Sequence, residues 1–253
     1  LSTVGPISIY GGNVTLNAAL TATGTGSAIA LQGSGNVTEG ANGHVVADKL
    51  ALLGGNVTLD SSSNTVGTLA ASGVGNLVYT NSNALTIGIV NPTGISATGP
   101  VRIETLSGNL LVTENISTSD ASANAVILNA GKSTAAGTAS GGNIVLSSGK
   151  TIQVGDGGTA KLYTGSVADS TGLTALLVSG SGRFRYNSDE ASSGYDTNNA
   201  ALGTGLYAIY REQPTLSVTP STAGSDYGDA VSLSGVTGTV SGYVNGDDAS
   251  KSG

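Results

Sequence analysis

The stretch Gly55-Asn56-Val57-Thr58-Leu59 decides the fold, because close relatives of it recur along the chain. Gly35-Asn36-Val37-Thr38 begins 20 residues before it, and Gly75-Asn76-Leu77-Val78-Tyr79 begins 20 residues after it. Further relatives are Gly12-Asn13-Val14-Thr15-Leu16, Gly108-Asn109-Leu110-Leu111-Val112 and Gly142-Asn143-Ile144-Val145-Leu146. A fixed period of about 20 residues, built from strand formers and turn formers, is typical of a solenoid in which each repeat stacks on the next.

Within each copy, apolar and polar residues alternate. In the first copy Val14 and Leu16 fall on one face of an extended segment and the polar residues on the other. A period of two predicts half-buried strands, and the Gly, Ser, Asn and Thr clusters between them predict turns. No stretch combines helical spacing with helix caps. We therefore expect an all-β protein with almost no helix.

Composition narrows the fold and the function. The chain has 253 residues with 40 Gly, no Cys, Met or Trp, and 4% aromatic residues. Val, Leu, Ile and Ala suit the thin core of stacked β-coils better than a rounded globule, which would bury larger side chains. Hydrophobic residues make up 38% and charged residues 10%, the opposite of the balance in disordered chains.

Charge and hydropathy argue against two partner classes. The net charge is −7, and the nine basic residues form no cluster that would grip phosphates, so we expect no nucleic-acid binding. No apolar run approaches the roughly 18 residues that cross a bilayer, so we expect no membrane span. Without Cys there is no disulfide.

The texture of the chain divides it into three parts. Residues 1–180 are uniform and predict a shaft of roughly nine coils, about 40 Å long at about 4.8 Å per stacked strand. Residues 181–212 carry Phe184, Tyr186, Tyr207 and Tyr210 and predict an aromatic-rich cap or transition over the open end of the shaft. Residues 213–253 alternate again and predict the beginning of a second small β module.

These residues carry a family likeness. The Gly-Asn-Val-Thr-Leu coils of residues 1–212 resemble the repeat region of filamentous-haemagglutinin-like exoproteins, large adhesins of Gram-negative bacteria. Residues 213–253 resemble the start of the MBG-type repeats found in many of them. The residues that match are Tyr227-Gly228-Asp229 and Ser241-Gly242-Tyr243-Val244-Asn245-Gly246-Asp247.

The resemblance implies a right-handed parallel β-helix that forms the shaft of a surface fibre. It also implies an outer-membrane transporter of the two-partner secretion route as partner, and an extracellular location on the bacterial cell surface. The family's secretion domain carries Asn-Pro motifs. Here only Asn91-Pro92-Thr93-Gly94-Ile95 is similar, deep within the coils, and we interpret it as a turn. We expect the secretion domain to lie outside this chain, as part of a longer polypeptide.

The sequence predicts no catalytic, cofactor-binding or metal-ligating residues and no cofactor. His44 is the only histidine, and the charged residues of the shaft are spread out, with no two acids at the coil period. The paired acids Asp189-Glu190 and Asp247-Asp248 stand alone. Gly155-Asp156-Gly157-Gly158 is interpreted as a tight turn, and calcium binding by the Asp-rich C-terminal turns remains an alternative.

Four Asn residues also fit the acceptor pattern for Asn-linked sugar, namely Asn13, Asn36, Asn56 and Asn115. We favour a structural role, because Asn tolerates positive φ at turns and stacked Asn side chains form hydrogen-bond ladders. The same role is predicted for the whole set of repeat-turn residues, Asn13, Asn36, Asn56, Asn76, Asn109 and Asn143. Thr21, Thr23 and Thr25 suggest an ice-binding array, which we reject because the unit does not recur.

Three functions follow from this reading. The first is a structural shaft of an adhesin, which attaches to host or matrix glycans or proteins and also self-associates into filaments. The second is a polysaccharide lyase or glycosidase, which requires a groove with acids from adjacent coils within about 10 Å. The third is a glycan-binding module in which Phe184, Tyr186, Tyr207 and Tyr210 form a sugar platform.

Overall fold

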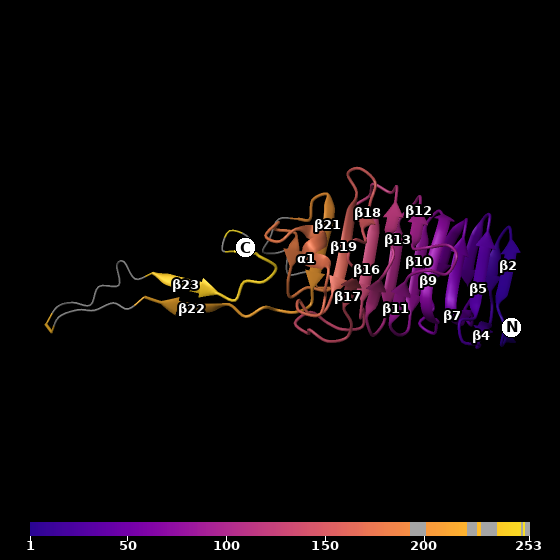
Figure 1. Cartoon of the computed structure of the whole chain (residues 1–253), viewed down its shortest axis with the longest axis horizontal. Coiled ribbons are helices and arrows are strands. Elements are labelled where there is room, and N and C mark those ends of the chain that lie inside the picture. Colours follow the sequence, from indigo (N-terminus) through magenta and orange to yellow (C-terminus); the bar gives the residue numbers. More distant parts are fainter. Residues whose placement is uncertain (193–200, 222–226, 229–236, 249, 251–253) are drawn as a thin grey trace.

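The computed structural model describes residues 1–192, 201–221, 227–228, 237–248 and 250, and these form an elongated rod with a hairpin at one end (Figure 1). The described residues are mostly strands with one five-residue helix, so the expected all-β class is confirmed. The strands run across the long axis of the rod, and the N-terminus lies at the end opposite the hairpin (Figure 1). No helix in the described ranges is long and apolar enough to span a bilayer.

Two large sheets build the rod, and every strand pair in them is parallel. The twelve-stranded sheet contains β1 (Ser2–Thr3), β2 (Ile7–Gly11), β4 (Ala19–Ala22), β5 (Ala28–Gly33), β7 (His44–Leu53), β9 (Thr65–Val74), β11 (Leu85–Ile87), β12 (Ile95–Ala97), β14 (Leu110–Val112), β15 (Ile116–Thr118), β17 (Ile144–Leu146) and β18 (Ile152–Gln153). The nine-stranded sheet contains β3 (Val14–Leu16), β6 (Asn36–Glu39), β8 (Asn56–Leu59), β10 (Leu77–Asn81), β13 (Val101–Thr105), β16 (Val126–Ala130), β19 (Thr159–Thr164), β20 (Phe184–Arg185) and β21 (Gly205–Tyr210).

The nine-stranded sheet keeps one register along most of its length. Val14 pairs with Val37, which pairs with Val57 and then with Leu77. The same column continues through Val101, Val126, Ala160 and Leu206. Successive members are 23, 20, 20, 24, 25, 34 and 46 residues apart, so the ladder is constant while the connections lengthen towards the C-terminus.

The alternation seen in the sequence is confirmed by burial. Val57 and Leu59 are fully buried while Asn56 and Thr58 are exposed, and the same pattern recurs in β3. One continuous aliphatic core draws side chains from both sheets. Burial of each Val or Leu contributes about 1.5–3 kcal/mol, which explains how a core without Met or Trp holds the rod together.

The glycine that precedes Asn56 at the start of β8 is required by the close approach of the preceding repeat. Gly55 has φ 62°, and a Cβ on it would lie 2.1 Å from the carbonyl oxygen of Gly35 in the preceding coil. Gly12 holds the same place in the first copy of the motif, but nothing lies within 4 Å of its Cβ position. The strand of the first copy, β3, is an edge strand of the nine-stranded sheet, so no earlier strand packs beneath it.

This contrast gives a matched pair of substitutions. We expect Gly55→Ala to lower the free energy of unfolding by about 1–3 kcal/mol, because the methyl group clashes with backbone and the φ is unfavourable. Gly12→Ala should change it by no more than about 0.5 kcal/mol. Urea denaturation followed by circular dichroism measures both. Equal effects at the two positions would show that coil stacking does not set the glycine requirement.

The C-terminal end of the rod is closed by several elements. β21 pairs with β19 over its full length and β20 pairs with β21, so the nine-stranded sheet extends through Tyr210. The helix α1 (Leu173–Leu177) buries Leu173 and Leu177 in the core. The sequence placed the shaft in residues 1–180 and the cap in 181–212. In the structure the residues that close the end of the rod begin with α1, before residue 181, and the sheet strand β21 lies within residues 181–212.

The aromatic residues predicted to act together occupy two faces of the sheet. Tyr210 stacks on Tyr186, with ring centroids 5.6 Å apart, and lies 6.5 Å from Phe184, on the core side. Tyr207 packs on the outer side with Ile127, Tyr163 and Ile209. Phe184, Tyr207 and Tyr210 are buried. The alternative of one exposed aromatic platform for glycans is therefore corrected: the four rings share no open face.

Residues after 212 leave the rod and then return to it. β22 (Ser217–Pro220) and β23 (Gly238–Ser241) form an exposed antiparallel hairpin that projects beyond the capped end (Figure 1). The following turn at Asn245 and Gly246 docks on the cap: the Gly180 N–H donates to the Asn245 carbonyl at 2.9 Å, and Tyr186 Oη donates to Asp247 at 2.8 Å. In the MBG-like motif, Tyr227 and Gly228 are exposed, and Asp229 lies outside the described residues.

Candidate functional site

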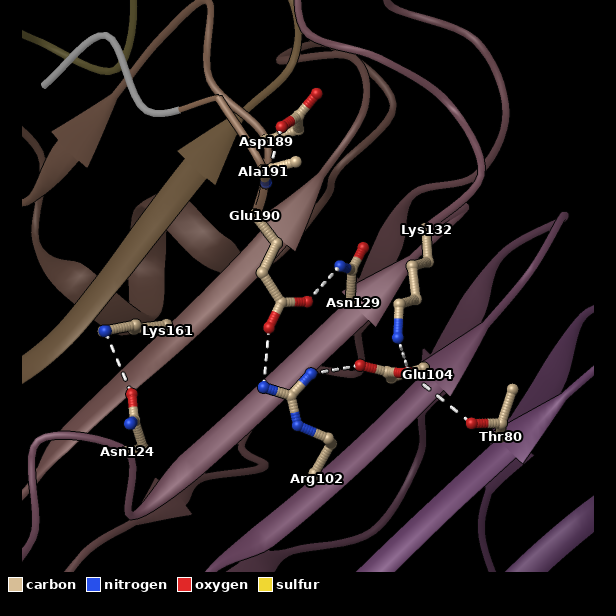
Figure 2. Close-up of polar contacts among 10 residues, drawn as sticks. All are labelled: Thr80, Arg102, Glu104, Asn124, Asn129, Lys132, Lys161, Asp189, Glu190 and Ala191. Atoms are coloured by element: carbon tan, nitrogen blue, oxygen red, sulfur yellow. Dashed lines mark hydrogen bonds and ion pairs between the residues drawn. The ribbon is translucent and has the colours of Figure 1, made fainter. Parts of the chain in front are cut away.

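Polar side chains gather on the outer face of the nine-stranded sheet, over β10, β13 and β16. Thr80 in β10, Glu104 in β13 and Asn129 in β16 stand in register across three strands. Arg102 lies two residues before Glu104 on the same strand and the same face, since Val101 and Ile103 are buried towards the core. Figure 2 shows these side chains pointing towards one another above the sheet.

Glu104 is the centre of this cluster. Its side chain is only 2% exposed, and its two carboxylate oxygens accept from different cations. Arg102 Nη1 donates to Oε1, and Lys132 Nζ donates to Oε2 at 2.5 Å. Lys132 follows β16, so its ion pair with Glu104 joins β13 to the connection that begins after the neighbouring strand β16.

Glu190 brings a distant segment onto the same sheet. Its Oε1 accepts from Arg102 Nη2 at 2.6 Å, and its Oε2 accepts from Asn129 Nδ2 at 3.1 Å (Figure 2). Along the chain Glu190 is 88 residues from Arg102 and 61 residues from Asn129. The neighbouring Asp189 accepts from the backbone N–H groups of Ala136, Ala191 and Ser192. The 187–192 segment is therefore held on the sheet by two adjacent acids.

The pKa shifts of Glu190 and Arg102 both favour the charged forms of these side chains. Burial alone would raise the pKa of Glu190, but the hydrogen bonds and positive charge of Arg102 outweigh it and lower that pKa. The hydrogen bond to Glu190 in turn raises the pKa of Arg102. A general acid at neutral pH needs a raised carboxyl pKa. Glu190 has the opposite shift, so its carboxyl group does not suit the role of a general acid at neutral pH.

The lowered pKa of Glu190 makes a pH prediction. Its stabilising contribution is complete above the ordinary value of 4.5 and is lost as pH falls through the lower pKa of the folded state. We expect wild type to be more stable than Glu190→Gln at pH 6–7, and the difference to shrink as the pH falls below 4.5. Urea midpoints of both proteins across this range measure it. A difference that stays constant from pH 7 to pH 3 would contradict the assignment.

A cavity of about 370 Å³ opens beside the cluster. It lies between the connection that follows β16 and the 187–192 segment. The residues that line it are Lys132, Ser133, Thr134, Ala135, Asp189, Glu190 and Ala191. Lys132 and Glu190 thus belong both to the ion-pair cluster and to the cavity wall.

The sequence reading missed this cluster. It described the charges of the shaft, Glu104 among them, as spread out, and it treated Asp189-Glu190 as a separate pair. The structure brings Glu104 and Glu190 together, because both carboxylates bind the guanidinium of Arg102. Spacing along the chain hid the contact, since Glu190 arrives from a connection outside the regular coils. In the part of the chain that the structure describes, no group of three His, Cys, Asp or Glu residues is placed to hold a metal ion. His44 has its Nδ1 3.3 Å from the Asn42 carbonyl oxygen.

The repeat-turn asparagines form two separate columns. In the first, the Asn36 N–H donates to Asn13 Oδ1 at 2.8 Å and the Asn76 N–H donates to Asn56 Oδ1 at 3.0 Å. Asn109 and Asn143 precede strands of the other sheet, where the Asn143 N–H donates to Asn109 Oδ1 at 2.9 Å. The widened spacing after Asn76 therefore marks a change of column. Asn115 similarly accepts from the Thr151 N–H at 2.9 Å.

Three fully buried polar side chains carry more bonds than any repeat-turn asparagine. Asn81 and Asn64 lie at corners between the sheets and bind backbone groups of Val66 and Val45. Arg211, 1% exposed, donates to the carbonyl groups of Ala130, Ser140 and Gly142. The sequence offers a weak signal for Asn81 alone, which is polar at the end of a mostly apolar strand.

Comparison with models of protein families, with curated proteins and with solved structures finds no match to this chain.

Proposed function

We propose that this chain is a shaft segment of a secreted bacterial adhesin or fibre, folded as a right-handed parallel β-helix. The likeness of its repeats to filamentous-haemagglutinin-like exoproteins supports this family, a location at the cell surface, and an outer-membrane two-partner transporter as the secretion partner. In this role the chain holds an attachment region away from the cell, binds host or matrix glycans or proteins, and associates side by side with other shafts.

The observation that carries the proposal is the unbroken parallel register. In the nine-stranded sheet each of the strands from β3 to β19 pairs with the strand one repeat along the chain. Growth by repetition in one direction produces length, and the backbone pairs with the coils on either side without metal or disulfide. The lowered pKa of Glu190 disfavours a general-acid role for this carboxyl group, which supports the shaft over the glycosidase alternative.

Deletion of a whole coil tests the shaft directly. Removing residues 57–76 joins Asn56 to Leu77, the register partner of Val57, and removes one step of the ladder. We expect a folded protein whose length in small-angle X-ray scattering falls by about 4.8 Å. Removing residues 57–66 deletes half a coil, breaks the register and should prevent folding. If both deletions unfold the protein, or both leave it folded, the stacked-coil account fails.

An activity screen tests the enzyme alternative. We expect the full chain to leave pectin, alginate and hyaluronan intact. Cleavage by wild type that is abolished in Glu104→Gln would favour a polysaccharide lyase or glycosidase over a shaft.

A further inference from the structure

The ion-pair cluster collects charge in a chain that is otherwise poor in it. The protein has nine basic and sixteen acidic side chains, and five of these meet at Arg102, Glu104, Lys132, Asp189 and Glu190. A buried ion pair stabilises a fold no better than apolar side chains of similar volume. Stability alone therefore gives no reason to place Glu104, only 2% exposed, at this point of the sheet.

The cluster holds two charged groups in fixed positions at the cavity wall. Lys132 lines the cavity, and Glu104, which does not, anchors its ammonium at 2.5 Å. Glu190 lines the cavity too, and its carboxylate is anchored by Arg102 at 2.6 Å and Asn129 at 3.1 Å from outside it (Figure 2). A binding group that is already held in place loses less conformational entropy when a ligand arrives.

Both groups keep hydrogen-bonding capacity for a ligand. An ammonium has three N–H donors and a carboxylate has about four acceptor sites. Within the described residues Lys132 spends one donor on Glu104, and Glu190 accepts one bond at each oxygen. The hydroxyls of Ser133 and Thr134 add groups that both donate and accept. The wall therefore offers a donor, an acceptor and two hydroxyls around one cavity.

The charge of the wall selects the class of ligand. Lys132, Asp189 and Glu190 together carry a net charge of −1, which disfavours uronates and other anions. A sugar hydroxyl donates to a carboxylate and accepts from an ammonium at the same time. The volume of about 370 Å³ falls within the roughly 300–1,000 Å³ range of small-ligand pockets. We propose that this cavity binds a neutral hexose unit of a glycan.

This inference deepens the attachment part of the proposed function and rests on it. Affinity electrophoresis of the full chain in native gels tests it, with dextran or galactomannan as neutral probes and polygalacturonate or hyaluronan as anionic probes. We expect retardation by at least one neutral polymer and by neither anionic one. Lys132→Gln and Glu190→Gln should each weaken the retardation about tenfold, because a hydrogen bond to a charged group is lost.

Two further variants separate binding from folding. Lys150→Gln removes the charge of the Lys150–Glu114 ion pair, whose atoms are 2.8 Å apart outside the cavity, and should bind like wild type. Ala135→Leu obstructs the cavity without touching the ion pairs and should abolish retardation at an unchanged Tm. No retardation of wild type by dextran or galactomannan, retardation by the anionic polymers alone, or equal losses in Lys150→Gln would each overturn the proposal. The coil deletion tests the shaft independently of sugar binding. If the deletion variant folds as expected but the wild type binds no sugar, only the present inference is rejected.

Discussion

Arg211→Met should lower the free energy of unfolding by about 3–5 kcal/mol. Arg211 Nη1 donates to the Ala130 carbonyl at 2.7 Å, and Nη2 donates to Gly142 at 2.6 Å and to Ser140 at 3.2 Å. Burial lowers the pKa of this guanidinium. Its charge is solvated by carbonyl dipoles at the end of β16 and in the long connection from β16 to β17, so methionine fills the volume but removes the three hydrogen bonds to those carbonyl groups.

Urea denaturation followed by circular dichroism measures this loss. Arg211→Lys keeps the charge but cannot span the three carbonyl groups with one ammonium, so we expect an intermediate loss. Lys161→Met is the control, because Lys161 forms an exposed bond of 3.0 Å to Asn124 and should matter by no more than about 0.5 kcal/mol. An Arg211→Met protein as stable as this control would show that the buried guanidinium does not anchor the connection.

Asn81→Leu is the second substitution with a large expected effect. Asn81 Oδ1 accepts from the Val66 N–H at 2.9 Å, and its Nδ2 donates to the Val66 carbonyl at 3.1 Å. The side-chain amide thereby takes the place of a neighbouring strand for one residue of β9. Leucine has a similar size but leaves both backbone groups buried and unpaired. We expect a loss of about 2–5 kcal/mol in unfolding free energy.

Asn76→Ala provides the comparison for Asn81→Leu. Asn76 is exposed at a repeat turn, and its backbone N–H, which survives the substitution, makes the bond to Asn56 at 3.0 Å. The expected loss is about 0.5 kcal/mol. Thermal unfolding of the two variants ranks them. A larger loss at Asn76 would mean that the exposed asparagine column stabilises the rod more than the buried corner does.

The strands of the rod were predictable because the alternation of apolar and polar side chains can be read from neighbouring residues alone. Val57 and Leu59 alternate with polar residues, and alternation fixes which face is buried whatever the partner. The same reasoning separates Tyr207 from Tyr210, since residues three apart on one strand face opposite ways. We grouped these rings into one cap because they are close together in the sequence. Counting positions along the strand would have placed Tyr207 and Tyr210 on opposite faces.

Features that depend on long-range contact were not predictable. The turn Gly108-Asn109 is chemically the same as Gly75-Asn76, yet it precedes a strand of the other sheet, because the motif encodes a turn followed by a strand and not a particular sheet. Glu190 and Arg102 meet only because a connection folds back over the sheet. Likewise, Asn favours turns wherever it occurs, so residue type alone does not separate the buried Asn81 from the exposed Asn76.

The direction of the backbone hydrogen bonds has a mechanical consequence. In both sheets these bonds link neighbouring parallel strands, and the strands lie across the long axis of the rod (Figure 1). Tension applied between the two ends therefore loads the bonds along their own length and opens them one rung at a time, without shearing a whole ladder at once. A stretched rod should therefore unfold in successive small steps, one strand pair at a time, and should re-form on the strands that remain paired.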